Sequence, residues 1–165
     1  MSKHTLSVLV EDKPGVLARI AGLFSRRGFN IESLAVGPTE HPDVSRMTIA
    51  VNVEDSPLEQ VTKQLNKLVE VIKIVELDGS ASVNRELLLV KVKARVTHVG
   101  SLWSACQRSG GRVLWDAPDS FTIEVTSSEA DINRFVAEIA NFGELLEVVR
   151  SGALAIQKGR EVLES

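Results

Sequence analysis

The chain has 165 residues, of which 44% are hydrophobic and 25% charged, and its net charge is −3; this composition fits one large globular domain or two small ones. The acidic balance argues against nucleic-acid binding, which needs clustered positive charge, and no apolar run is long enough to cross a bilayer. Because residues 1–5 lack the apolar core of a signal peptide and the single cysteine, Cys106, excludes an internal disulfide, we expect a cytoplasmic protein without nucleic-acid or membrane partners.

Residues 1–78 predict the element order β-α-β-β-α-β. Four segments have the strand-like apolar pattern of a half-buried sheet: 5–10, 29–36, 47–53 and 71–77. Two segments have apolar residues at helical spacing: 16–24 and 58–68. Asp12 is placed to cap the first helix and Gly28 to end it, while the broken alternation at Ser33-Leu34 indicates a bulge. This order is the split βαβ arrangement of ferredoxin-like folds.

Residues 79–165 predict the same order again. The expected strands are 86–96, 113–116, 121–125 and 145–156. One helix covers 99–106, and Ser128 caps the other. The sequence therefore predicts an α+β protein with two tandem ferredoxin-like βαββαβ domains, 1–78 and 79–165, each an antiparallel four-stranded sheet with its helices on one face. Such a sheet leaves its other face and its edges open, which favours association.

The loop before the first helix is a candidate amino-acid pocket. A helix N-terminus offers backbone N–H groups and partial positive charge to a carboxylate, and Gly15 lets the backbone approach a ligand closely. Asp12 or Asn30 can accept hydrogen bonds from an ammonium group. The same residues also suit an N-cap and a turn glycine that need no ligand. The residues alone leave both interpretations open.

No catalytic or metal-binding constellation is apparent. Glu11 and Asp12 are neighbours and would point to opposite faces of a strand, which makes them a poor acid–base pair. The three histidines lie in different predicted elements without ligand spacing. Cys106 lies on an apolar helix face, which is typical of a buried thiol. The basic residues at 91, 93 and 95 form either a solvated face or a protein-docking surface.

Several segments resemble a known family. Residues 6–17 (LSVLVEDKPGVL) resemble the opening of an ACT domain. Residues 23–34 (LFSRRGFNIESL) are similar to the small regulatory subunit of acetohydroxyacid synthase, also called acetolactate synthase. The segments 45–49 (SRMTI) and 63–69 (KQLNKLV) strengthen this resemblance. The similarity is weakest over 97–143.

The resemblance implies a regulatory subunit with no catalytic activity of its own. Members of this family bind a large catalytic subunit that carries thiamine diphosphate, Mg and FAD, so no cofactor is expected on this chain. They raise the activity of that subunit and confer feedback inhibition, typically by valine, in branched-chain amino acid biosynthesis. Their ACT domains form a homodimer, and valine binds between the two protomers.

The same resemblance implies the effector-binding residues. These are Asp12, Pro14, Gly15, Val16 and Leu17 from one protomer, and Asn30 and Ile31 from its neighbour. Some relatives carry asparagine in place of Asp12, so another branched-chain amino acid is an alternative effector. Two other classes of protein stay open: a stand-alone ACT sensor that acts on transcription, and an enzyme of ferredoxin-like fold. The first would need a DNA-reading helix and the second convergent catalytic side chains.

Overall fold

The computed structural model describes residues 2–53, 55–160 and 162–163, and the side chains of 55 and 56 are not described. The chain folds into two compact units, one of residues 1–83 with 153–165 and the other of residues 84–152. The division expected from the sequence, 1–78 and 79–165, places residues 79–83 and 153–165 in the second domain. These segments pack together within the first unit instead, where the Lys158 N–H donates to the Ala81 carbonyl oxygen at 2.8 Å.

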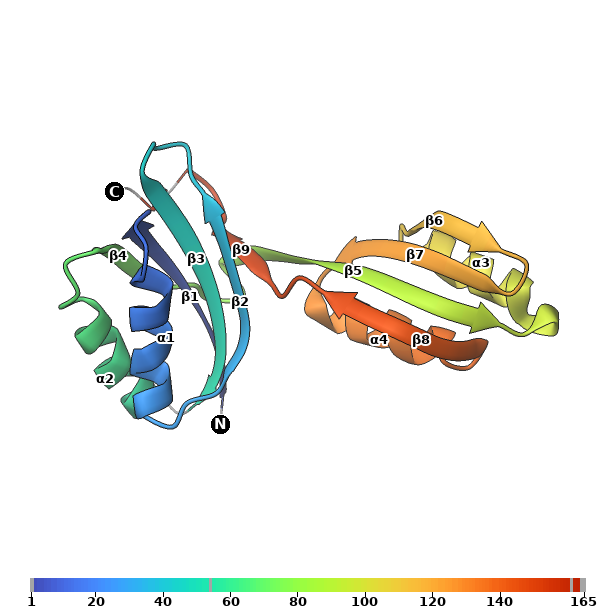
Figure 1. Cartoon of the computed structure of the whole chain (residues 1–165), viewed down its shortest axis with the longest axis horizontal. Coiled ribbons are helices and arrows are strands. Elements are labelled where there is room, and N and C mark those ends of the chain that lie inside the picture. Colours follow the sequence, from blue (N-terminus) through green and yellow to red (C-terminus); the bar gives the residue numbers. More distant parts are fainter. Residues whose placement is uncertain (1, 54, 161, 164–165) are drawn as a thin grey trace. The chain divides into compact units, whose positions relative to one another are not determined.

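The first unit is a four-stranded antiparallel sheet with two helices on one face (Figure 1). Its elements are β1 (Ser2–Glu11), α1 (Val16–Arg26), β2 (Ile31–Pro38), β3 (Val44–Val53), α2 (Asp55–Leu65) and β4 (Val71–Glu76). The strand order is β2-β3-β1-β4, so β2 and β4 are the edges. The predicted βαββαβ order is confirmed here.

The core of the first unit lies between the sheet and the two helices. Each helix buries three apolar residues at helical spacing against alternate residues of β1 and β3. The buried helix residues are Val16, Ile20 and Phe24 of α1 and Leu58, Val61 and Leu65 of α2. This packing fixes the position of α1, and with it the loop that precedes the helix.

Both ends of α1 depend on glycines with a left-handed backbone. Gly15 precedes the helix with φ 86°, and no side chain caps it, so the prediction that Asp12 caps α1 is wrong. The Asp12 N–H instead donates to the Asp43 carbonyl oxygen at 2.8 Å, which ties it to the β2–β3 hairpin. At the other end Gly28 has φ 73°, and the Phe29 N–H donates to the Phe24 carbonyl oxygen at 3.0 Å. The predicted glycine stop is confirmed, because this is the Schellman geometry.

The second unit has the same order of elements. They are β5 (Ser82–Ala94), the 3₁₀ turn η1 (Val96–His98), α3 (Val99–Arg108), β6 (Arg112–Ala117), β7 (Ser120–Ser127), α4 (Glu129–Ile139) and β8 (Gly143–Arg150). The sheet has five strands, one more than the predicted four: four run in the order β6-β7-β5-β8, and a further strand after β8 pairs with β5. Both helices again lie on one face (Figure 1). Ser128 caps α4 as predicted, because its hydroxyl accepts the Asp131 N–H. The tandem ferredoxin-like fold predicted from the sequence is confirmed.

The last predicted strand, 145–156, is wrong as one continuous strand. β8 ends at Arg150, Gly152 turns the chain with φ 77°, and a separate strand β9 (Leu154–Gln157) pairs with β5. An ion pair with one buried partner holds the end of β8. Arg150 donates from Nε and Nη2 to the two carboxylate oxygens of Glu86 at 2.7 and 2.9 Å, and Glu86 is only 5% exposed.

Candidate effector site

The loop between β1 and α1 presents the amino end of α1 to solvent. The Val16 N–H bends back to the Lys13 carbonyl oxygen at 3.4 Å, so the left-handed Gly15 leads directly into the helix. Within the described residues, the N–H groups of Leu17 and Ala18 make no hydrogen bond. Unpaired amides at a helix N-terminus carry partial positive charge, so this loop can bind an anionic group.

The cationic side chains around this loop are paired with carboxylates. The Lys13 ammonium lies 2.6 Å from Glu11 Oε2, and this hydrogen bond raises the pKa of Lys13. The Arg19 guanidinium pairs with Glu70. Asp12 is exposed and makes no ion pair with any described residue. The loop therefore offers free backbone donors for a carboxylate and one unpaired acid for an ammonium group.

Arg19 was not found by sequence reasoning, although it borders the loop. A Cβ built on Gly15 would lie 3.9 Å from Arg19 Nη2. Arg19 follows Gly15 by four residues, which is one helical turn, so helical spacing was the signal that could have placed it there. Its partner Glu70 lies far along the chain, and nothing in the local sequence connects the two.

The predicted residues of the first half of the site differ in what they expose. Asp12, Pro14 and Gly15 are exposed, and Leu17 is 43% exposed. Val16 is only 3% exposed, because its side chain packs in the core under α1. Val16 can therefore contact a ligand at this surface only through its backbone.

The predicted second half of the site lies at the other end of α1 in the same chain. Asn30 follows the glycine stop, and Ile31 begins β2 opposite Val51. The 11 residues of α1 separate its two ends by about 16 Å at a rise of 1.5 Å per residue. One copy of the chain therefore does not bring Asn30 and Ile31 to the loop that holds Gly15. A second copy would have to supply them.

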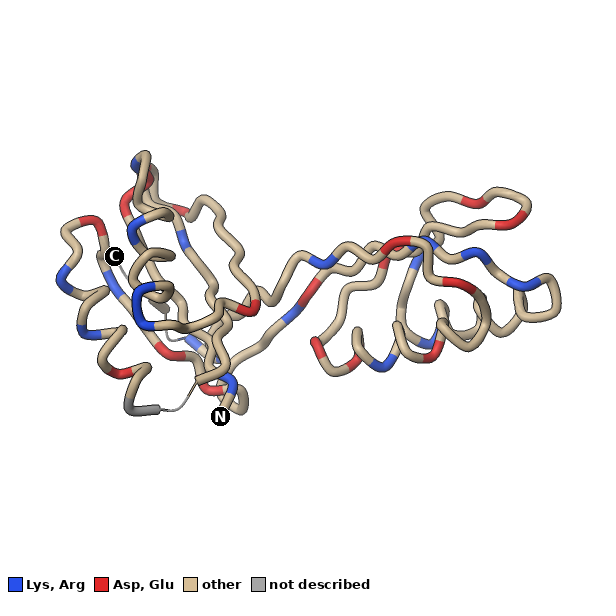
Figure 2. The backbone as a smooth tube through the Cα atoms, turned by 60° about the horizontal axis from the view of Figure 1, so that its bottom comes forward, with Lys and Arg blue, Asp and Glu red and all other residues tan. Residues whose placement is uncertain are grey.

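The described residues contain no other arrangement that points to catalysis or metal binding. They hold no group of three or more metal-ligating side chains. Burial raises the pKa of the Cys106 thiol, which is 2% exposed, so the predicted buried thiol is confirmed. Basic and acidic residues are interspersed along both units (Figure 2). None of the described helices is both long and apolar enough to span a membrane.

Comparison with known proteins defines the class first. Residues 6–73 match the model of the AHAS small subunit-like ACT domain. Residues 85–159 match the model of the small subunit of acetolactate synthase. The first unit is thus an ACT domain, and the second carries the C-terminal part of the same kind of subunit.

Whole-chain relatives agree with these two matches. The acetolactate synthase small subunit of Mycolicibacterium smegmatis is 53% identical over 94% of this chain and 91% of its own. The probable acetolactate synthase small subunit of Archaeoglobus fulgidus is 49% identical over 96% of this chain and 99% of its own. The crystal structure of the Thermotoga maritima small subunit has a TM-score of 0.88 at 32% identity, covering 98% of this chain and 100% of that one. This chain belongs to the family of acetolactate synthase small subunits.

Proposed function

We propose that this chain binds the large catalytic subunit of acetolactate synthase, raises its activity and makes it sensitive to valine. Membership of the small-subunit family supports the partnership. Thiamine diphosphate, Mg and FAD are then held by the large subunit, and this chain contributes no catalytic group. Branched-chain amino acids are the end products of the pathway, so they are the natural feedback effectors.

The single observation that carries the proposed effector site is the free amino end of α1. The unpaired amides of Leu17 and Ala18 suit the carboxylate of valine, and the unpaired Asp12 suits its ammonium group. The half-exposed Leu17 offers apolar contact to the short side chain. In this proposal Asn30 and Ile31 of a second copy complete the site, which makes the site a property of the homodimer.

Regulation follows if valine ties two ACT domains into an arrangement that stimulates the large subunit less. Such coupling between sites is typically worth about 1–3 kcal/mol, or roughly 5- to 150-fold in affinity. The edge strand β2, which carries the half-exposed Val36, is a surface through which two copies can pair. Valine bound beside such a pairing would stabilise one arrangement of the dimer over others.

The test is acetolactate formation by the cognate large subunit, with and without this chain, across a valine titration. We expect stimulation by the chain and loss of that stimulation as valine rises. If valine leaves the stimulation unchanged, the titration is repeated with leucine and with isoleucine as the effector. No stimulation, together with no complex on gel filtration, would overturn the proposed partnership.

A further inference from the structure

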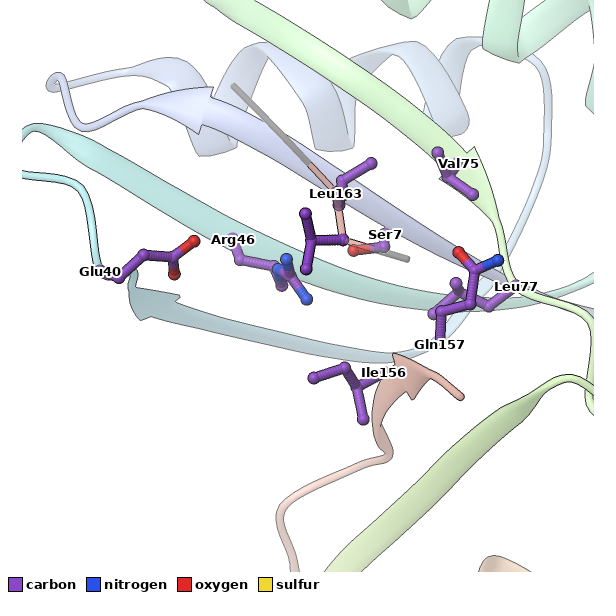
Figure 3. A pocket seen from close by; sticks show the side chains of 9 residues that line it. Ser7, Glu40, Arg46, Val75, Leu77, Ile156, Gln157 and Leu163 are labelled. Atoms are coloured by element: carbon purple, nitrogen blue, oxygen red, sulfur yellow. The ribbon is translucent and has the colours of Figure 1, made fainter. Parts of the chain in front are cut away.

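The face of the first sheet that lies opposite α1 and α2 carries a cavity of about 180 Å³ (Figure 3). Strands β1, β3 and β4 form its floor, and the returning segment that begins with β9 lies over it. All of its walls belong to the first unit. The volume is below the roughly 300–1,000 Å³ typical of sites for drug-sized ligands, so only a small molecule fits.

Ser7 places an unsatisfied hydroxyl in this cavity. It lies between the core residues Leu6 and Val8, so its side chain points to the opposite face of the sheet. Ser7 is only 1% exposed, and its Oγ makes no hydrogen bond with any described residue. Buried polar groups are normally hydrogen-bonded, so a lone buried hydroxyl that lines a cavity points to a ligand as its partner.

Arg46 brings a positive charge to the same cavity. It lies opposite Leu9 on β1 and therefore diagonally beside Ser7 on the same face of the sheet. Its side chain extends into the cavity above Ile156 (Figure 3). Within the described residues, the guanidinium has no ion pair and no side-chain hydrogen bond. A partly buried arginine that pairs with no acid among the described residues is a ready partner for a carboxylate.

The other walls are mainly apolar. Val75 and Leu77 border the cavity from β4 and the residues after it, and Ile156 borders it from β9 (Figure 3). One acid, Glu40, lies at the rim in the β2–β3 connection, where its side chain is 71% exposed and 3.8 Å from His41. One arginine, one hydroxyl and the side-chain amide of Gln157 beside mainly apolar walls suit a carboxylate with an aliphatic tail. The apolar walls favour such a ligand over phosphate, which has no apolar part to place against them.

We propose that this cavity binds a short aliphatic carboxylate, with its carboxylate on Arg46 and Ser7 and its tail against Val75, Leu77 and Ile156. The site uses none of the α1-loop residues, it lies on the face of the sheet opposite α1, and it is complete within one copy of the chain. Two kinds of molecule have this chemistry. One is an aliphatic amino acid, whose ammonium group would donate a hydrogen bond to Glu40. The other is the matching 2-oxo acid, which has no ammonium group.

The experiment is methyl NMR of the full chain, titrated separately with valine and with 3-methyl-2-oxobutanoate. We expect saturable shifts of the methyl groups of Val75, Leu77 and Ile156. Arg46→Gln should weaken this binding by about tenfold or more, because it removes a charge-assisted hydrogen bond. Shifts at Leu17, on the α1 loop, report the proposed effector site separately, so either site can fail without the other.

Arg26→Gln is the matched control, because Arg26 is an exposed arginine of the same unit at the end of α1, away from the cavity. Ser7→Ala is the second variant: it should weaken binding without destabilising the free chain, since it removes a hydroxyl that has no partner. Glu40→Gln distinguishes the two ligands, because it should weaken binding of the amino acid and leave binding of the 2-oxo acid unchanged. The absence of saturable shifts at the cavity methyls below about 10 mM, or shifts that survive Arg46→Gln unchanged, would overturn the proposal.

Discussion

Replacing Gly15 with aspartate tests the proposed carboxylate site directly, and asparagine at the same position is the matched control. A Cβ at Gly15 meets nothing closer than Arg19 Nη2 at 3.9 Å, so there is room for the first atom of either side chain. Both variants share the cost of the left-handed φ of 86°, which Asp and Asn tolerate better than most residues. The two variants therefore differ mainly in charge.

The charge decides the expected size of the effect. At a separation of about 5 Å and an effective dielectric constant of about 20, two carboxylates repel by about 3 kcal/mol. This corresponds to a loss of valine affinity of roughly a hundredfold or more. The aspartate would also take the free amides of α1 for itself, as acids at a helix N-terminus do. Gly15→Asn should lose affinity by less than about tenfold, because a neutral amide does not repel the ligand.

Isothermal titration of valine into each purified variant measures these affinities, and acetolactate formation with the large subunit measures the consequence. Gly15→Asp should still stimulate the large subunit but should resist valine. Gly15→Asn should still be inhibited by valine, but at higher valine concentrations. Equal losses in the two variants would refute the reasoning, because charge at the amino end of α1 would then not control binding. Loss of stimulation together with inhibition would mean that the substitution disrupted the dimer or the fold.

Three further predictions concern the stability of the second unit and of α1. Glu86→Gln should lower the free energy of unfolding by about 2 kcal/mol, because it leaves the Arg150 guanidinium without its charged partner; urea unfolding measures this, and an unchanged midpoint contradicts it. Gly143→Ala should destabilise the chain strongly, since its Cβ would lie 2.3 Å from a backbone oxygen of β5. Gly22→Ala lies in open space within α1 and should instead stabilise the chain by about 0.5–1 kcal/mol. Thermal unfolding compares the two variants, and similar shifts in melting temperature would argue against this account. Hydrogen bonds from the two serine hydroxyls before α4 lower the pKa of Asp131 below 3.8, so its contribution to stability is present above that pH and is lost as the pH falls through the lowered pKa. Asp131→Asn should therefore flatten the acid limb of a melting-temperature profile, and an unaltered limb would count against the assignment.

The order of elements could be predicted because apolar spacing follows directly from burial. Met47, Ile49 and Val51 alternate along β3 and are all 2% exposed or less. The cap of α1 could not be predicted in the same way. Asp12 has the right chemistry and position in the sequence, but its backbone N–H is bound to the hairpin at Asp43. The residue at the N-cap of α1 is instead Gly15, in a left-handed conformation. Tertiary contact overrides local preference here.

The break between β8 and β9 could not be predicted for a related reason. Apolar residues continue on both sides of Gly152, so the pattern concealed a turn that the positive φ of this glycine creates. The candidate effector loop, by contrast, is a local feature that could be predicted from residues 12–17. The cavity at Ser7 and Arg46 could not be, because it depends on strand register and on the return of a segment about 150 residues further along the chain.

The first unit is discontinuous in sequence, and this affects its folding during synthesis. The second unit, residues 84–152, is one uninterrupted stretch, whereas the first needs residues from both ends of the chain. On the ribosome, the ACT sheet can form its helix-covered core early, but the segment over its other face emerges only after the whole second unit has been made. Until Lys158 reaches Ala81, that face is open to chaperones and to other nascent chains. Expression of residues 1–78 alone would make this transient state permanent.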